Sequence, residues 1–585
     1  MAGFSNVLVA NRGEIAIRIF RTLRELGLTS VAVYSDADRG ALHVRAADQA
    51  VALGGDTAAE SYLSIEKLLG AARTSGAEAV HPGYGFLAEN AGFARAVEEV
   101  GLVWIGPPPE AIELMGHKTA ARTRMKEAGV PIIPGTTDPV ASAAEIVALG
   151  EEIGYPLIVK AAAGGGGKGM KIVGSPEEAE RAFESASREG QSYFADAAVY
   201  VERFLEDPRH VEVQVLADAH GNVIHLGERD CTIQRRHQKL IEETPSPAVD
   251  EELRERIGKI AVDAARAAGY RSAGTIEGLL APDGSYYFME MNTRIQVEHT
   301  VTEEVTGLDL VREQILIAAG ERLSVRQEDV VLRGHAIECR INAEDVSREF
   351  LPAPGRITHY REPAGPGVRV DSGVVEGSEI SPLYDPMIAK LIVRDVDRER
   401  ARRRMLRALE EFEIGGVKTL LGFHRALLEH PCFVEGETCH GVVESDALAA
   451  RAGELTVEHT SSRDGTGRLV ERVTPVEVDG RRFEVTVLAS EPPWLELARS
   501  RRERADASGH GGSGAVVSPM QGTVLSVAVA EGDIVEAGAV LCIVEAMKME
   551  NEIAAHRAGV VTELTVAQGQ PVQNGQVICV LANDE

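Results

Sequence analysis

Short β-rich runs alternate with helical patterns over residues 1 to about 115. The strand-like runs lie at 7–10, 31–34, 79–80 and 103–105. An amphipathic stretch at 14–20 follows the first of them. Strands separated by helices are typical of βαβ units, so the pattern predicts a parallel sheet. Residues 81–85 should form a loop at the carboxyl edge of that sheet, where ligands collect.

The pattern changes in the middle of the chain. Two strand-like runs, 156–160 and 170–173, flank a run of glycines, which predicts a strand–loop–strand lid rather than a strand–loop–helix motif. From about 206 to 447, alternating strands such as 210–215 are mixed with helical stretches such as 251–268 and 399–413. This mixture is typical of an α+β arrangement.

The last 70 residues contain an internal repeat. Residues 532–542 match 569–579 at an offset of 37, and Gly522 and Gly559 keep the same offset. Two copies of one short β unit predict a two-fold pseudosymmetric, all-β sandwich. Residues 545–550 fall between the copies and are expected to form an exposed turn that joins the halves.

A composition shift separates this repeat from the preceding part of the chain. Charged and small residues dominate 448–515, apart from a hairpin pattern at 476–485 with Asp479-Gly480 at its turn. Residues 499–515 are rich in Arg and then in Gly and Ser, which is typical of a flexible linker.

Composition and charge narrow the class of protein. A chain of 585 residues corresponds to three to five domains, and its formal net charge of −29 argues against general binding to nucleic acid or anionic membranes. No apolar run is long enough for a membrane helix, and the first residues lack a signal-peptide pattern, so a cytoplasmic location is expected. Six dispersed cysteines without a C-x-x-C pair predict reduced thiols rather than disulfides or a zinc site.

Lys548 lies between two methionines at the symmetry point of the repeat. Taken alone, a lysine in a β turn is usually an ordinary surface residue. The sequence Ala546-Met547-Lys548-Met549, however, resembles the attachment motif of the biotinyl carrier family, whereas lipoyl domains share that fold but usually lack the flanking methionines. The resemblance implies covalent biotin on Lys548.

The glycine run 164–167 has Lys160 and Lys168 on its two sides. Consecutive glycines let backbone N–H groups approach phosphate oxygens closely. The run is not a P-loop, because Gly169 rather than Ser or Thr follows Lys168 and both flanks are strands. Taken alone it fits a flexible loop equally well, and its place in a lid favours phosphate binding.

Five polar residues alternate with mostly apolar ones between 290 and 298. They are Glu290, Asn292, Arg294, Gln296 and Glu298. A solvated edge strand gives the same alternation, but Glu277 ends another β-like run, so carboxylates and an amide oxygen are expected to converge as ligands for Mg²⁺. Eight extended steps span about 26 Å, more than a nucleotide site needs, so the later part is expected to curve back.

Together these features resemble the ATP-grasp enzymes, and specifically biotin carboxylase, over residues 1 to about 447. The strings that carry the resemblance are 9–16, 81–90, 228–231, 234–239, 290–299 and 334–344. The resemblance implies a Rossmann-like α/β N-terminal domain at 1–115, an ATP-grasp domain at 116–330 with its lid at about 130–205, and a C-terminal domain at 331–447. A linker with a β-hairpin would follow at 448–515, and the biotinyl carrier domain at 516–585.

The resemblance also implies roles for the matching residues. Those expected to bind ATP are Lys118, Lys160, Gly166, Gly167, Glu202, Leu205, His210, Gln234, His237 and Leu279. Those expected to hold bicarbonate are Lys239, Arg294, Gln296 and Val297, and those expected to bind Mg²⁺ or Mn²⁺ are Glu277, Glu290 and Asn292. Glu298 would be the general base, with Arg294, Arg340 and Lys239 as the other catalytic residues. Cys231 is expected to be a buried packing residue.

The whole chain is similar to the α subunit of acyl-CoA carboxylases of the actinobacterial type. This implies ATP-dependent carboxylation of the chain's own biotin, and the implied partners are biotin protein ligase and, in a hetero-oligomer, a separate carboxyltransferase β subunit. Two alternative functions account for less of the sequence. A different ATP-grasp ligase would not explain Lys548 and the repeat, and an inactive carrier scaffold would not explain the set Glu277, Glu290, Arg294, Glu298 and Arg340. The acyl-CoA itself does not follow from this sequence.

Overall fold

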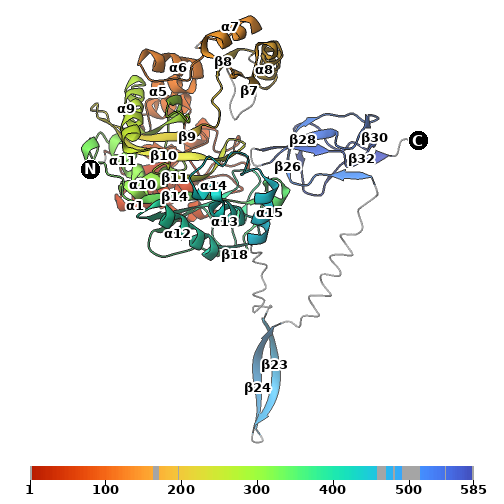
Figure 1. The fold of residues 1–585 in the computed structure, drawn as a ribbon. Helices are drawn as coiled ribbons and strands as arrows, with labels where there is room; N and C mark the ends of the chain where they lie inside the picture. Colours follow the sequence, from red (N-terminus) through yellow and green to blue (C-terminus); the bar gives the residue numbers. More distant parts are fainter. Residues whose placement is uncertain are drawn as a thin grey trace.

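The computed structural model describes residues 3–136, 138–161, 170–194, 197–456, 469–478, 481–490, 514–546 and 549–582. Figure 1 shows the N-terminal and central parts packed together, with a smaller β domain beside them. No helix among the described residues combines the length and the apolar character needed to cross a bilayer.

A parallel five-stranded sheet forms the N-terminal part, as the alternating pattern predicts. Its strand order is β3-β2-β1-β4-β5. The strands are β1 (Asn6–Val9), β2 (Thr29–Tyr34), β3 (Gln49–Ala52), β4 (Ala79–His81) and β5 (Val103–Trp104), and the helices are α1 (Gly13–Glu25), α2 (Leu42–Ala46), α3 (Ile65–Ser75), α4 (Ala91–Glu99) and α5 (Pro109–Gly116). The order reverses between β1 and β4, and Asn11 bridges the two strand ends by donating to the carbonyls of Pro82 and Tyr84, at 2.7 Å each.

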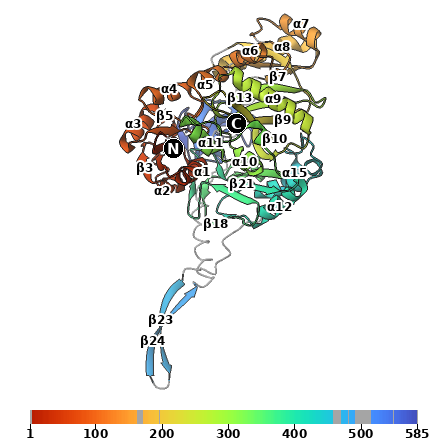
Figure 2. The ribbon, with the colours of Figure 1, turned by 90° about the vertical axis from the view of Figure 1, so that its left-hand side faces the viewer.

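The predicted lid is a small layer above the central sheet (Figure 2). α6 (Lys118–Glu127) precedes it, and the lid contains α7 (Ala143–Ile153), β6 (Leu157–Ala161), β7 (Met170–Val173), η1 (Pro176–Glu178), α8 (Ala179–Phe194) and β8 (Val199–Arg203). The three strands pair antiparallel in the order β7-β6-β8, which confirms the strand–loop–strand prediction. Leu157, Val159 and Val201 belong to an apolar core of the lid itself.

An eight-stranded antiparallel sheet forms the centre of the molecule. Its order is β13-β12-β9-β10-β11-β14-β21-β19. The strands are β9 (Arg209–Ala217), β10 (Val223–Arg235), β11 (Gln238–Thr244), β12 (Ser272–Leu280), β13 (Tyr286–Asn292), β14 (His335–Asn342), β19 (Val368–Ser372) and β21 (Met387–Asp395). Because β11 pairs with β14, the sheet continues across residue 330, where the sequence suggested a change of domain. Side chains from the predicted ATP-grasp and C-terminal regions therefore share one surface.

Helices and short strands surround this sheet. The helices are α9 (Glu251–Ala267), α10 (His299–Thr306), α11 (Leu310–Ala318), η2 (Gln327–Asp329), η3 (Val346–Arg348), α12 (Arg398–Glu411), α13 (Leu421–Glu429), α14 (Pro431–Val434) and α15 (Asp446–Leu455). The short strands are β15 (Glu344–Asp345), β16 (Leu351–Pro352), β17 (Gly355–Arg356), β18 (His359–Arg361), β20 (Glu379–Ile380) and β22 (Glu413–Gly415).

The prediction of six reduced cysteines is wrong for one pair. Cys432 and Cys439 form a disulfide, because the chain turns back after α14 and brings their Cα atoms to 5.5 Å, within the usual range for a bridge. The spacing of the cysteines gives no sign of this turn. The other four cysteines are free and buried.

The predicted hairpin is present and longer than the sequence suggested. Strands β23 (Leu469–Val478) and β24 (Arg481–Ser490) pair antiparallel from one end to the other. Its turn residues, Asp479 and Gly480, lie outside the described residues.

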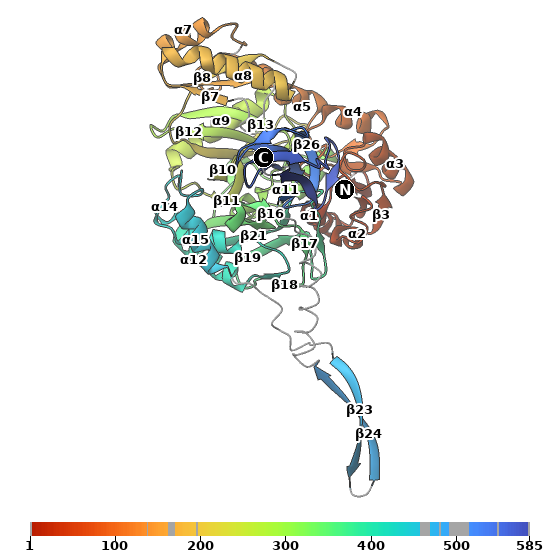
Figure 3. The ribbon, with the colours of Figure 1, turned by 90° about the vertical axis from the view of Figure 1, so that its right-hand side faces the viewer.

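The C-terminal residues 514–546 and 549–582, here called the terminal sandwich, form two four-stranded sheets, as the repeat predicts. In Figure 3 this domain lies in front of the central part of the molecule. The strands are β25 (Ala515–Val517), β26 (Gly522–Val527), β27 (Ile534–Val535), β28 (Val540–Ala546), β29 (Met549–Ala554), β30 (Gly559–Thr562), β31 (Pro571–Val572) and β32 (Val577–Ala582). β26, β27 and β28 begin 37 residues before β30, β31 and β32, respectively, so the repeat is a structural repeat. Lys548 and Met547 lie outside the described residues, between β28 and β29.

Two equivalent glycines set the close packing of this sandwich. A Cβ on Gly522 would lie 2.3 Å from the carbonyl oxygen of Glu545, and a Cβ on Gly559 would lie 2.4 Å from that of Ala582. Both neighbours are backbone atoms of a strand, so neither has the freedom of a side chain to move away.

We therefore expect Gly522→Ala and Gly559→Ala each to destabilise the terminal sandwich by about 1–3 kcal/mol, the usual cost of overpacking. Hydrogen exchange of the β26, β28, β30 and β32 amides in the full chain measures this locally. Thr523→Ala, at an exposed neighbouring position, is the control and should leave exchange unchanged. Unchanged protection in both glycine variants would show that the strands are not packed this closely.

Candidate active site

Lys239, on β11, lies among three carboxylates at the centre of the large sheet. Its Nζ donates to Glu212 Oε2 at 2.6 Å, to Glu298 Oε1 at 2.7 Å and to Glu277 Oε1 at 3.0 Å. Burial lowers the pKa of Lys239, but the three carboxylates outweigh it and hold the pKa well above the usual range. The lysine is therefore a fixed cation.

Glu298 directly precedes α10, and its side chain is fully buried. One carboxylate oxygen accepts from Lys239, and Oε2 accepts from Arg340 Nη2 at 2.9 Å. Burial raises the pKa of Glu298, but Lys239, Arg340 and Arg229 outweigh it, so the pKa lies well below its ordinary value. The carboxylate is therefore ionised.

A second buried cation, Arg229, holds Glu212, one of the three carboxylates around Lys239. Arg229, on β10, is completely buried and donates to Glu212 Oε1 at 2.6 Å and to Gln214 Oε1 at 2.8 Å. Cys231, two residues on, lies 3.8 Å from Glu298 Oε1, and burial raises the pKa of its thiol well above the usual value. A neutral, buried thiol is a poor nucleophile, which agrees with the packing role expected for it.

Arg294 connects the site to the N-terminal part of the chain. Its Nε donates to Glu89 Oε2, its Nη1 to Gln296 Oε1 and its Nη2 to Asn292 Oδ1, each at 2.9 Å. Glu89 lies in the loop region after β4, within one of the strings that suggested the family. The segment that follows the predicted ligand loop (81–85) therefore meets the predicted catalytic run.

The polar run 290–298 curves back, as its length required. Strand β13 ends at Asn292, and the following residues form a turn that leads to α10. Asn292 Nδ2 and Gln296 Nε2 both donate to Glu277 Oε1 at 2.7 Å. The strand and the turn together bring the polar side chains to one point, which a single extended strand would not do.

Lys390 holds this turn from the other side, a contact that the sequence did not reveal. The lysine is fully buried on β21, and its Nζ donates to the carbonyl of Val297 at 2.8 Å and lies 3.4 Å from Glu14 Oε1. A lysine within an apolar strand run was the available signal, because such a charge needs a buried partner.

The predicted metal ligands fit a divalent cation in part. Glu277 and Glu290 are opposite one another in the β12–β13 register, so both carboxylates project from the same face. Burial and then the charge of Glu277 raise the pKa of Glu290, an excess of negative charge that a cation would relieve. Asn292 is arranged differently, because its amide oxygen accepts from Arg294 rather than facing the two carboxylates.

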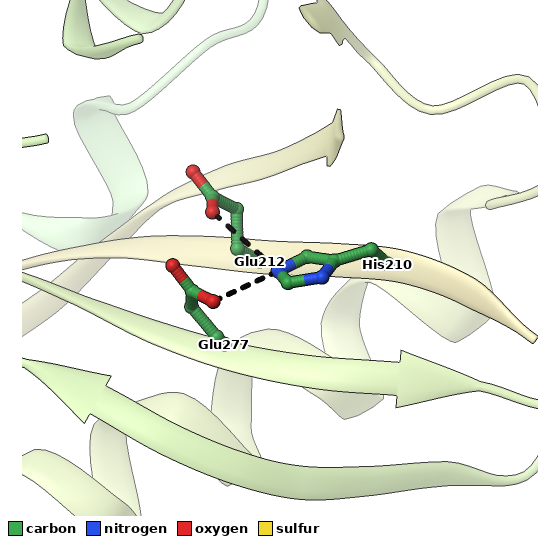
Figure 4. Close-up of side chains that lie close together, drawn as sticks. All are labelled: His210, Glu212 and Glu277. Atoms are coloured by element: carbon green, nitrogen blue, oxygen red, sulfur yellow. Dashed lines mark ion pairs between the residues drawn. The ribbon is translucent and has the colours of Figure 1, made fainter. Parts of the chain in front are cut away.

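His210 brings a third kind of donor to the same place (Figure 4). Its Nε2 lies 2.9 Å from Glu277 Oε2 and 4.0 Å from Glu212 Oε2. One potential ligand atom from each of these three residues lies within 4.8 Å of the others. Lys239 contacts both carboxylates of this group and supplies positive charge there.

A cleft of about 2250 Å³ opens above these residues. All the predicted ATP residues that the structure describes line it, namely Lys118, Lys160, Glu202, Leu205, His210, Gln234, His237 and Leu279. Gly166 and Gly167 lie outside the described residues. Lys239, Arg294, Gln296, Val297 and Arg340 line the same cleft. The expected nucleotide and bicarbonate residues thus border one space.

Arg122 is a second residue of the cleft that the sequence analysis did not predict. It is buried on α6, forms an ion pair with Glu202 and donates to the carbonyl of Ile133 at 3.0 Å. Lys160 contacts the other oxygen of Glu202. Glu202 therefore joins the base of the lid to α6, and no motif around Arg122 marked that contact in advance.

Four family models match successive parts of the chain. They are the biotin carboxylase N-terminal domain over 3–112, the carbamoyl-phosphate synthase L chain ATP-binding domain over 117–326, the biotin carboxylase C-terminal domain over 338–445, and the biotin-requiring enzyme model over 514–581.

Relatives match at high identity. A biotin carboxylase of Nostoc sp. is 55% identical over 441 residues, covering 75% of this chain and 99% of the relative. A biotin-dependent acyl-coenzyme A carboxylase alpha3 subunit of Mycobacterium leprae is 47% identical over 568 residues, covering 95% of each chain.

Solved structures agree with this family. A biotin carboxylase–βγ-ATP complex from Campylobacter jejuni is 46% identical with a TM-score of 0.71, covering 74% of this chain and 98% of the other. The biotin carboxylase domain of 2-oxoglutarate carboxylase from Hydrogenobacter thermophilus, in complex with MgADP, ADP and bicarbonate, is 49% identical with the same TM-score, covering 74% and 96%.

The four family models cover the carboxylase part of the chain and the terminal sandwich. The first three models follow one another across the N-terminal sheet, the lid and the central sheet, and the fourth covers the terminal sandwich. With a relative that is 47% identical along 95% of both chains, the chain belongs to the biotin carboxylase family and carries an ATP-grasp biotin carboxylase and a biotinyl domain on one polypeptide.

Proposed function

We propose that this chain carboxylates biotin on its own Lys548, using ATP and bicarbonate, as the α subunit of an acyl-CoA carboxylase. The observation that carries the proposal is the pair of cations, Lys239 and Arg340, on the two oxygens of the buried Glu298. The pair lies beside a cleft that the expected nucleotide residues line. Such a site suits an anion that must be bound and deprotonated.

The first step would be deprotonation of bicarbonate by Glu298 and attack of its oxygen on the γ-phosphorus of ATP. Carboxyphosphate and ADP would result. Lys239 and Arg294 would stabilise the charge spread over the transferring phosphoryl group. A divalent cation held by Glu277 and Glu290 would neutralise phosphate charge when bound.

The second step would transfer the carboxyl group. Carboxyphosphate would break into CO₂ and phosphate, and that phosphate would take the proton from the ureido nitrogen of biotin. Arg340 would stabilise the enolate-like oxygen that forms, and the nitrogen would then attack CO₂. Phosphate and carboxybiotin are the products, and each proton has an acceptor.

The low pKa of Glu298 follows from its two cations and is expected to change when substrate binds. An anion between Lys239 and Arg340 would compete with Glu298 for both of them. Losing that stabilisation raises the proton affinity of the carboxylate. Bicarbonate would therefore strengthen the base at the moment it is needed.

Similarity along the whole chain favours the acyl-CoA assignment. The first three-quarters of the chain do not discriminate, because one of the pyruvate carboxylase subunits of Methanothermobacter thermautotrophicus is also 55% identical over 434 residues. The acyl-CoA carboxylase subunit of M. leprae matches through the terminal sandwich as well. We accordingly propose a cytoplasmic hetero-oligomer in which the partner is a carboxyltransferase β subunit, with biotin protein ligase as the modifying enzyme.

Glu298→Gln removes the proposed base while keeping the shape of the side chain. We expect bicarbonate-dependent ATP hydrolysis with free biotin to fall by about 10²–10⁴-fold, the usual contribution of a general base. Glu304→Gln, on the same α10 but outside the cleft, should keep near-normal activity. Full activity in Glu298→Gln would remove the base assignment.

The intact mass of the purified chain should include one biotin adduct, and the chain should bind avidin. Lys548→Arg should lose both properties, whereas Lys418→Arg, in the loop before α13, should keep both. A chain without the adduct after co-expression with biotin protein ligase would contradict the attachment site.

The hairpin β23–β24 is the proposed docking element for the β subunit. Replacing 465–490 by a Gly/Ser segment of equal length should abolish both carboxylation of acyl-CoA and co-purification with that subunit. Carboxylation of free biotin should stay normal, because the hairpin lies outside the carboxylase domains. Unchanged association would refute the docking role, and a reconstituted complex that carboxylates pyruvate rather than acetyl-, propionyl- or longer acyl-CoA would refute the acyl-CoA assignment.

A further inference from the structure

The terminal sandwich is seated at the mouth of the cleft. Leu351, on the short strand β16, packs against the apolar core of the sandwich, although it belongs to the carboxylase part of the chain. Lys239, Arg294 and Arg340 share the lining of the cleft with six residues of the sandwich, namely Pro519, Met520, Ile543, Asn551, Glu552 and Ile553. Figures 1 and 3 both place the sandwich beside the central part of the molecule.

The cleft-lining residues that lie on strands of the sandwich all belong to the sheet β29-β28-β26-β31. Ile543 lies on β28 and Asn551 and Ile553 on β29, the two strands on either side of residues 547–548. The repeat supplies an equivalent of Ile543 at Val580, 37 residues later, and Val580 does not line the cleft. The repeat relates the two sheets to one another, so the fold alone does not select the sheet that faces the cleft.

The segment 346–351 is held in an unusual conformation that presents Leu351. Glu349 and Phe350 have φ values of 55° and 60°, a region that costs a non-glycine residue roughly 1–2 kcal/mol. Phe350 is buried, with the Arg235 guanidinium 4.3 Å from its ring centre and the Phe423 ring edge-on at 5.0 Å. Packing of Phe350 thus stabilises the loop conformation that places the following residue, Leu351, against the sandwich.

Charge favours the same pairing. Between residues 514 and 582, the chain has seven acidic and two basic residues. The lining of the cleft includes Arg235, Arg236 and Arg348, and Arg236, whose side chain is 65% exposed, lies 3.6 Å from Glu349. Glu552 of the sandwich borders the same space. Opposite charges on two surfaces raise the rate of productive encounter.

We propose that 346–351, here called the docking segment, is the surface on which this chain's own biotinyl domain is seated to receive the carboxyl group. Leu351 is the apolar anchor, and Arg348 with its neighbours steers the acidic sandwich. The assignment rests on the proposed function and adds a surface to it. It predicts residues that matter for carboxylation of the carrier and not for carboxylation of free biotin.

The experiment compares these two acceptors in the full chain. Leu351→Asp should lower the single-turnover rate of carboxylation of the chain's own biotin at least 10-fold and leave kcat/KM for free biotin within twofold. Leu351→Met should behave as the wild type. Val396→Asp changes another exposed aliphatic side chain, 65% exposed and outside the cleft, and should affect neither acceptor.

Steering is tested separately with Arg348→Glu. The wild-type rate on the chain's own biotin should fall as ionic strength rises, and the variant should start lower and lose most of this salt dependence. Free-biotin carboxylation by the variant should match that of the wild type at each salt concentration. A wild-type rate that does not depend on protein concentration identifies the carrier as the chain's own, and a rate that rises with concentration would assign the segment to a second copy and overturn the proposal.

These outcomes distinguish failure of the docking assignment from failure of the proposed function. Unchanged carboxylation of the carrier in Leu351→Asp, or equal losses on both acceptors, would overturn the docking assignment and leave the proposed function in place. A wild-type chain that carboxylates neither acceptor with ATP and bicarbonate would overturn the proposed function instead.

Discussion

The shared contact of Lys239 with Glu212, Glu277 and Glu298 is the interaction on which the rest of the site depends. Three carboxylates this far from water would repel one another and be protonated without a cation between them. The ammonium group fixes their positions, and each comes from a different element: β9, β12 and the turn before α10. The strand order of the central sheet thus brings distant parts of the chain to one charge.

The charges around Lys239 nearly cancel. Lys239, Arg229 and Arg340 face Glu212, Glu277, Glu298 and Glu242. Burial raises the pKa of Glu242 despite its contact with Arg340, which brings the sum of charges closer to zero. A neutral cluster tolerates burial, but an arriving anion makes it negative. The extra charge favours proton uptake by the nearest carboxylate, so binding and deprotonation are parts of one electrostatic response.

Much of this fold followed from periodicity, because local patterns report local structure. The alternating runs gave the parallel sheet, and the 37-residue offset gave both halves of the sandwich. Contacts that depend on side-chain orientation could not be predicted from these sequence patterns. The amide of Asn292 is turned by Arg294, and Lys390 reaches Val297 from a strand 93 residues away. Cys432 and Cys439 meet because α14 is followed by a sharp return, which their spacing does not encode.

Catalysis at Glu298 and movement of the biotin carrier require different kinds of contact. The chemistry needs a rigid, buried site, and Glu298 is accordingly fully buried among fixed cations. A carrier must arrive and leave in each cycle, so a large apolar interface would hold it too long. One aliphatic side chain and a rim of exposed arginines suit this need, because charge accelerates encounter more than it slows release. The pseudosymmetric sandwich turns β28 and β29, the strands on either side of the attachment residue, toward the cleft, which gives that brief contact a single productive orientation.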